Sequence, residues 1–87
     1  RVGSNVQTVK PGDRVIAYVF YFCGSCDSCC RGRENLCADM QGVLGVKGQP
    51  GAYGELVRIP ARQVVKIPET LAFEDASVLC DAGLTAY

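Results

Sequence analysis

The segment Cys23-Gly24-Ser25-Cys26-Asp27-Ser28-Cys29-Cys30-Arg31-Gly32-Arg33-Glu34-Asn35-Leu36-Cys37 holds five of the six cysteines in this 87-residue chain. Two residues separate Cys23 from Cys26 and Cys26 from Cys29, and Cys37 follows after a further seven. Thiolates at this spacing can surround one cation, and four of them form the closed tetrahedral set typical of structural zinc. Gly24 suits the tight turn, because glycine readily adopts positive φ and lets backbone N–H groups approach the sulfurs. The segment therefore predicts a structural metal site.

Cys30 leaves the ligand register open, because Cys26 and Cys30 could also be ligands with three residues between them. We favour Cys29, which keeps the two-residue spacing even. Three other uses of the cysteines compete with zinc. A disulfide framework would suit a secreted chain, but residues 1–22 contain no secretory segment. A ferredoxin-type iron–sulfur cluster needs its fourth cysteine after three residues and then a proline, and unrelated free thiols would not cluster in this way.

Strand patterns lie on both sides of the cysteine segment. Lys10-Pro11-Gly12-Asp13 has the residues that a type II turn favours, and a β-branched and aromatic run follows over residues 14–22. Residues 52–59 alternate between two faces, and residues 63–67 form a second short run. A proline follows each of these two runs and ends it. Residues 38–50 predict a loop.

The pattern becomes helical from Phe73 onward. An apolar stripe recurs at steps of three and four residues, comprising Phe73, Ala76, Cys80, Leu84 and Tyr87. Asp81 and Thr85 share another face, one turn apart. Gly83 costs the helix about 1 kcal/mol relative to alanine, so we expect a close backbone approach there. The chain as a whole therefore predicts a mainly β fold with a terminal helix.

Charge and length exclude several classes of function. Nine basic and nine acidic side chains balance formally, which gives no electrostatic basis for binding nucleic acid or an anionic membrane. No apolar run approaches the length of a membrane span. Cysteines used as metal ligands are typical of a reducing compartment, so we expect a cytoplasmic protein. The chain begins without methionine and ends within an apolar helical pattern, and we expect an internal fragment of a longer protein.

The motifs and their order resemble the zinc-dependent medium-chain alcohol dehydrogenases. The likeness covers nearly the whole chain. It rests on the cysteine spacing with Gly-Arg-Glu-Asn-x-Cys inside it, and on Pro11-Gly12-Asp13-Arg14-Val15, Gly51-Ala52-Tyr53-Gly54-Glu55 and Asp81-Ala82-Gly83-Leu84-Thr85-Ala86-Tyr87. It implies a partial GroES-like catalytic domain over residues 1–87. Its parts would be barrel strands in 1–22, a structural-zinc lobe in 23–37, barrel strands in 51–68, and in 72–87 the start of a helix leading toward a nucleotide-binding domain.

The resemblance also implies a reaction. Family members transfer hydride between a small alcohol and the matching aldehyde or ketone, with NAD or NADP as cofactor, and assemble as homodimers or homotetramers. The structural zinc would be held by Cys23, Cys26, Cys29 and Cys37. Asp81 matches the third ligand of a second, catalytic zinc, and Thr85 matches a position beside the nicotinamide ring. From the residues alone we would favour a solvated or helix-capping carboxylate for Asp81, and the resemblance reverses that choice. Thr85 could equally bond to its own helix backbone.

Further expectations follow from what the chain contains and from the resemblance. It has no histidine and no G-x-G-x-x-G motif, so the isolated 87 residues should not oxidise alcohols. The aromatic approach to the first cysteine, with Val19 and Tyr21, would line a substrate pocket or simply fill the barrel core. Cys80 is expected to be a buried core thiol. The alternative to a dehydrogenase fragment is a free-standing, zinc-stabilised module that binds a partner.

Overall fold

The computed structural model describes every residue of the chain, 1–87, and these residues form two compact units. Unit 1 comprises Arg1–Tyr18 and Ile59–Tyr87, and unit 2 comprises Val19–Arg58. Each unit contains one two-stranded sheet. No helix has both the length and the apolar character needed to cross a bilayer.

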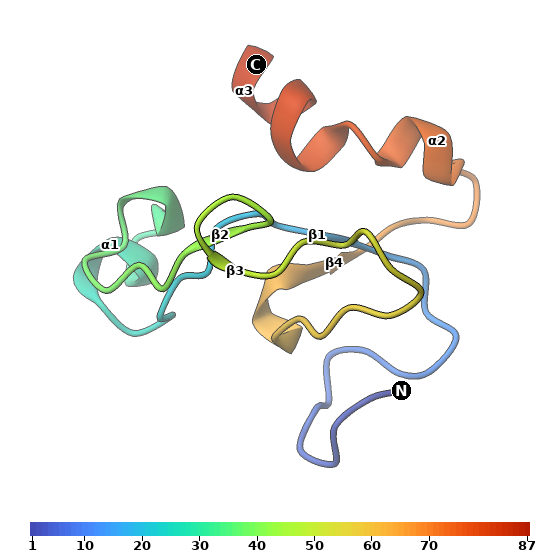
Figure 1. Cartoon of the computed structure of the whole chain (residues 1–87), viewed down its shortest axis with the longest axis horizontal. Helices are drawn as coiled ribbons and strands as arrows, with labels where there is room; N and C mark the ends of the chain where they lie inside the picture. The colour runs from blue at the N-terminus through green and yellow to red at the C-terminus, as the bar shows by residue number, and fades with distance from the viewer. The chain divides into compact units, whose positions relative to one another are not determined.

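The sheet of unit 1 pairs β1 (Val15–Ala17) with β4 (Val64–Lys66) in antiparallel orientation (Figure 1). Both strands are rich in valine and isoleucine, which pack well on a pleated surface. The 3₁₀ turn η2 (Ala61–Gln63) leads into β4. Its last residue, Gln63, is fully buried and accepts a 2.7 Å hydrogen bond from the N–H of Tyr18. The strand expected at 63–67 is therefore confirmed as β4.

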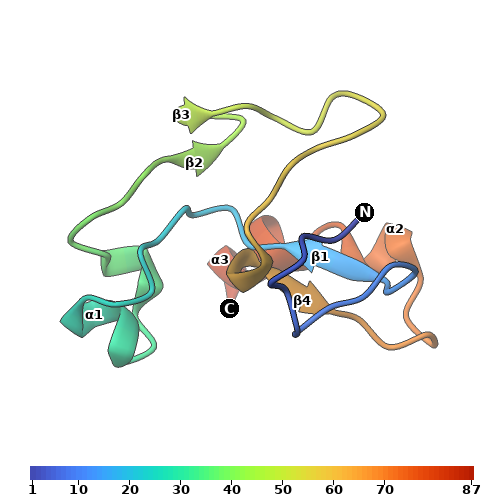
Figure 2. The same ribbon diagram turned by 90° about the horizontal axis from the view of Figure 1, so that it is seen from below.

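The C-terminal part of unit 1 is helical but not continuous. It comprises α2 (Phe73–Ala76), a π-helical turn η3 (Leu79–Gly83) and α3 (Leu84–Ala86), which lie on one side of the β1–β4 pair (Figures 1 and 2). The helix thus begins at Phe73, as predicted. At Gly83 the backbone N–H donates to the oxygen of Val78, five residues back, at 2.7 Å. The apolar stripe is mostly exposed, and Ala76 is its one buried member.

The close approach expected at Gly83 is made by the chain itself. A Cβ at this position would lie 3.1 Å from the oxygen of Val78, because the π turn brings that carbonyl inward. Glycine removes this contact, which offsets its low helix propensity. The glycine therefore marks the irregular turn rather than an approach by another element.

Unit 2 contains the cysteine segment and a compact glycine-rich coil. The segment forms one turn of helix, α1 (Asp27–Cys30), and a 3₁₀ turn, η1 (Glu34–Leu36). The region predicted as loop, 38–50, includes β2 (Val43–Leu44) and β3 (Gly48–Gln49), which pair in parallel. Gly42 precedes β2 with φ of +134°, and an added Cβ there would collide with the backbone oxygen of Lys47.

The strands are shorter than the sequence predicts, and these 87 residues form no closed barrel. The strand expected over residues 14–22 is limited to β1 and an isolated bridge between Phe20 and Val43. The strand expected at 52–59 does not form. An alternating pattern specifies two faces, but a strand also requires a neighbour for its N–H and C=O groups. In 52–59 a local turn bond from Gly54 N–H to Ala52 O replaces a ladder, and Leu56 stays 90% exposed.

Candidate metal centre

Four cysteine sulfurs lie together in unit 2. The Sγ atoms of Cys23, Cys26, Cys29 and Cys37 are all within 4.8 Å of one another. Cys23 and Cys29 are 4.0 Å apart, as are Cys26 and Cys37, and none of the four is in a disulfide. A tetrahedral ion with metal–sulfur bonds of about 2.3 Å requires sulfurs roughly 3.8 Å apart. The sulfurs therefore stand close to the positions that ligands of a single tetrahedral ion would occupy.

This spacing also discriminates between the metal alternatives. In an iron–sulfur cluster the four thiolates are distributed over two or more iron atoms, so they cannot all stand as close together as the ligands of one ion. All-thiolate tetrahedral sets are typical of zinc, a soft-ligand preference that hard cations such as magnesium do not share. The residues present fit a structural zinc ion.

Local backbone geometry explains how the segment gathers these sulfurs. Gly24 has φ of +81°, as the sequence predicts, and it turns the chain between Cys23 and Cys26. Cys26 occupies the N-cap position of α1, and Cys29 follows three residues later on the same face of that turn. Cys37 lies directly after η1, and it is the most buried of the four. One short helix and two turns are therefore sufficient to place all four side chains.

Backbone N–H groups surround the sulfurs. The N–H groups of Ser25 and Cys26 donate to Cys23 Sγ at 3.4 and 3.3 Å, and these bonds lower the pKa of the Cys23 thiol to about 6. The N–H groups of Cys29 and Ala38 likewise lower the pKa of Cys26. Amide dipoles directed at a sulfur favour its thiolate form, which is the form that binds metal. The sequence does not reveal the role of Ala38, because Ala38 acts on Cys26 through its backbone N–H, which every residue except proline has.

The pKa of Cys29 shifts in the opposite direction. Its withdrawal from water, with a further contribution from the neighbouring sulfurs, raises the pKa of the Cys29 thiol to about 12. Four thiolates at this separation would repel one another, which opposes full deprotonation of the set. The N–H donors at Cys23 and Cys26 favour the thiolate form, and the environment of Cys29 favours the thiol.

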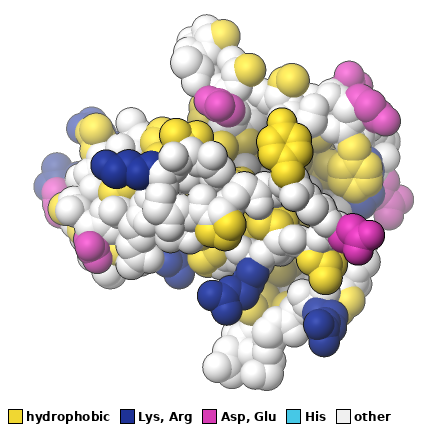
Figure 3. All heavy atoms as spheres, in the orientation of Figure 1, with side chains coloured by type: hydrophobic (Ala, Val, Ile, Leu, Met, Phe, Trp, Pro, Cys, Tyr) yellow, Lys and Arg dark blue, Asp and Glu magenta, His cyan; other side chains and the backbone are white.

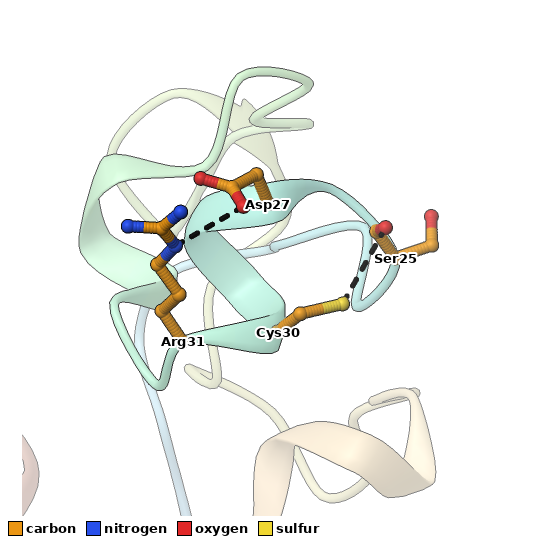
Figure 4. Close-up of polar contacts among 4 residues, drawn as sticks. All are labelled: Ser25, Asp27, Cys30 and Arg31. Carbon is orange, nitrogen blue, oxygen red and sulfur yellow. Dashed lines mark hydrogen bonds and ion pairs between the residues drawn. The ribbon is translucent and has the colours of Figure 1, made fainter.

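Cys30 lies outside the group of four. Its side chain is exposed and donates through Sγ–H to the backbone oxygen of Ser25 at 3.6 Å (Figure 4). One residue along a helix turns a side chain by about 100°, which separates the direction of Cys30 from that of Cys29. The same view shows Arg31 paired with Asp27 at 3.1 Å, a pair on α1 that is largely exposed. The geometry thus selects Cys29 for the set and leaves Cys30 free.

Asp81 and Thr85 lie side by side in unit 1, as predicted. Thr85 Oγ1 donates to Asp81 Oδ1 at 3.5 Å, and Asp81 lies in the middle of the π-helical turn. Both side chains are exposed, and neither joins a cluster of potential metal ligands in these 87 residues. Cys80 is only half-buried, and that burial raises its thiol pKa. The structure therefore places this pair together, one turn apart.

Tyr21 is buried in the core of unit 2 and does not line an open pocket in these 87 residues. It is 5% exposed, its N–H donates to Gly42 and its carbonyl accepts from Gln41. Val19 accepts a bond from Leu44 through its carbonyl. These two residues fill and pair with the coil that follows the cysteine segment.

Side chains of both charges are exposed. On the face shown in Figure 3, basic and acidic groups are both present among apolar ones. This agrees with the formal balance of nine basic and nine acidic residues.

Comparison with known proteins adds a family. Residues 1–69 match the family described as the alcohol dehydrogenase GroES-like domain. Two proteins of Geobacillus stearothermophilus, each named alcohol dehydrogenase, are 42% and 40% identical to this chain over 87 and 88 residues. Each alignment covers 99% of this chain and 25% of the relative. The chain thus spans about a quarter of the length of these curated relatives.

Proposed function

This chain belongs to the alcohol dehydrogenase family with a GroES-like domain, and from that premise we propose that the whole protein is a zinc-dependent alcohol dehydrogenase. It would transfer hydride between a small alcohol and NAD or NADP, with an aldehyde or ketone as the oxidised partner. The observation that carries the zinc part of the proposal is the group of four sulfurs within 4.8 Å. We place the enzyme in the cytoplasm, as a homodimer or homotetramer.

The structural zinc would be held by Cys23, Cys26, Cys29 and Cys37. Its role is to cross-link a segment that has little apolar core of its own, since Leu36 is exposed and Cys37 is the only buried residue among 23–37. Structural zinc of this kind contributes on the order of 10 kcal/mol to folding. The backbone donors around Cys23 and Cys26 would hold these sulfurs as thiolates and fix their direction.

A catalytic role is proposed for the pair on the π-helical turn. Asp81 would be one ligand of the catalytic zinc, whose other ligands come from outside residues 1–87. When bound, that metal supplies Lewis acidity toward the alcohol oxygen. Thr85 donates to Asp81 Oδ1 and so can hold the carboxylate in one direction. The same hydroxyl is the group we propose to face the nicotinamide ring.

The test measures metal and turnover together in the whole protein. Mass spectrometry should find two zinc ions per chain, and the Asp81→Asn variant should retain one of them. Alcohol-dependent reduction of NAD or NADP should be present in the wild type and fall at least about 100-fold in Asp81→Asn, since this change weakens a metal ligand. A wild type that binds zinc but reduces neither cofactor with any alcohol would overturn the proposed reaction. A wild type without zinc would overturn both metal sites.

A further inference from the structure

Arg14 makes an extensive set of contacts with the segment that precedes the helices of unit 1. Its Nη1 donates to the backbone oxygens of Pro68 and Glu69, both at 3.0 Å, and its Nη2 donates to the oxygen of Leu71 at 2.7 Å. These acceptors lie 54 to 57 residues further along the chain. The donors of a guanidinium lie in one plane at fixed angles. Hydrogen bonds to three carbonyls at once therefore fix the side chain of Arg14 relative to the backbone that carries those carbonyls.

The same side chain also contacts the first helical residue. The guanidinium carbon lies 4.2 Å from the centre of the Phe73 ring, a cation–π contact. Phe73 opens α2, which has no side-chain hydrogen bond at its N-cap. Arg14 therefore meets the connecting turn and the start of the helix together, and supplies a restraint that the cap does not.

The backbone of Arg14 is itself fixed by the sheet. Its carbonyl accepts from the N–H of Ile67 at 3.0 Å, which continues the β1–β4 ladder by one bond. The side chain of Arg14 thus transmits the position of the sheet to the segment 68–73.

We propose that Arg14 is a positioning residue for the reaction, because it sets the point and direction from which the helical segment carrying Asp81 and Thr85 departs. This inference rests on the proposed function. Asp81 lies eight positions after Phe73, a distance of up to about 12 Å at the rise of a helix. A tilt of about 5° at Phe73, transmitted through the α2 and η3 turns, would then move Asp81 by up to roughly 1 Å, and a misplacement of that size can cost about 100-fold in rate.

The test compares matched variants of the whole protein. Arg14→Lys keeps the charge but loses the fork, and Phe73→Leu removes the ring but keeps the three carbonyl contacts. Lys66→Met is the control, since it breaks the neighbouring ion pair with Asp13 and leaves the contacts of Arg14 intact. The readouts are amide hydrogen exchange in peptides covering 71–77, and kcat and KM measured separately.

We expect Arg14→Lys to speed exchange in 71–77 at least tenfold and to lower kcat by 10- to 100-fold, with KM for the alcohol changed less than threefold. Phe73→Leu should speed exchange in 71–77 and lower kcat by two- to fivefold each, with KM for the alcohol again little changed. Lys66→Met should leave exchange in 71–77 and kcat within twofold of wild type. Millimolar guanidinium chloride should restore part of the kcat of Arg14→Ala, and sodium chloride at the same concentration should not. A role in global stability alone would give no such rescue.

Two outcomes would overturn the inference. Unchanged exchange in 71–77 for Arg14→Lys would show that the contacts do not restrain the segment, whatever the protein catalyses. Faster exchange with an unchanged kcat would show that the restraint does not serve the reaction. A wild type that oxidises no alcohol would overturn the proposed function instead, and the exchange comparison would still decide the restraint because it does not depend on turnover.

Discussion

The two units of this chain are held together by different kinds of interaction. Unit 2 gathers four sulfurs from one stretch of fifteen residues, in an arrangement that could hold a metal ion. Unit 1 joins β1 to residues about fifty positions later through a ladder, an ion pair and the fork of Arg14. A local site with distinctive chemistry can therefore be recognised in a sequence, whereas a restraint between common residues that are far apart in the chain cannot.

The largest predicted effect separates Cys29 from Cys30. Cys29→Ser should remove about one zinc per chain from the whole protein and expose unit 2 to rapid amide exchange, because a structural zinc contributes on the order of 10 kcal/mol. Cys30→Ser should keep the zinc and change stability by less than about 0.5 kcal/mol, as exposed substitutions usually do. Mass spectrometry of native protein measures the metal, and exchange reports the two units separately. Zinc loss from Cys30→Ser with retention in Cys29→Ser would reverse the assignment.

This contrast also shows how far the sequence could predict the site. The even spacing of Cys23, Cys26 and Cys29 predicts the set that the structure brings together, because one helical turn and one glycine turn place them without help from elsewhere. The geometry supplies what spacing could not, namely the backbone donor at Ala38 and the burial that raises the pKa of Cys29. Asp81 and Thr85 were also adjacent as predicted, since their separation of one turn is a local property.

The fold was less predictable wherever partners are distant. The helix starts at Phe73, but its break at Leu79–Gly83 had only Gly83 as a signal. Residues 52–59 alternate in polarity but form no strand, because a strand requires a pairing partner and the alternation does not specify one. In the sequence Arg14 belongs to the motif Pro11-Gly12-Asp13-Arg14-Val15, and only the folded chain shows its three carbonyl acceptors.

A second prediction compares glycines of the two units. Gly42→Ala in unit 2 should destabilise its coil by about 3 kcal/mol, because both its positive φ and the nearby oxygen of Lys47 oppose a side chain. Gly12→Ala in unit 1 should cost only about 1 kcal/mol, since its φ is +93° but the space around it is open. Native-state exchange of peptides covering 41–49 and 10–17 gives the local opening free energies. Equal free-energy costs of Gly42→Ala and Gly12→Ala would show that backbone strain alone, and not the nearby oxygen of Lys47, sets the cost of the substitution.

The smallest predicted effect concerns the ion pair that keeps β1 on β4. Asp13 accepts hydrogen bonds from Lys66 Nζ and from the N–H of Lys10, both at 2.9 Å. The bond from Lys66, followed by that from Lys10, lowers the pKa of Asp13 below its ordinary 3.8. A pKa that is lower in the folded state contributes stability above about pH 3.8, and this contribution is lost as the pH falls through the folded pKa.

Asp13→Asn should therefore weaken unit 1 at neutral pH and flatten its loss of stability in acid, while the exchange of unit 2 at pH 6 to 7 stays unchanged. NMR titration of the Asp13 carboxyl in the whole protein measures the shift directly, and Lys66→Met should move this pKa back toward 3.8. A wild-type pKa at or above 3.8 would show that the ion pair contributes nothing in solution. The register of β1 on β4 would then depend on the ladder and Arg14 alone, and the effect of Arg14→Lys on residues 71–77 should be correspondingly larger.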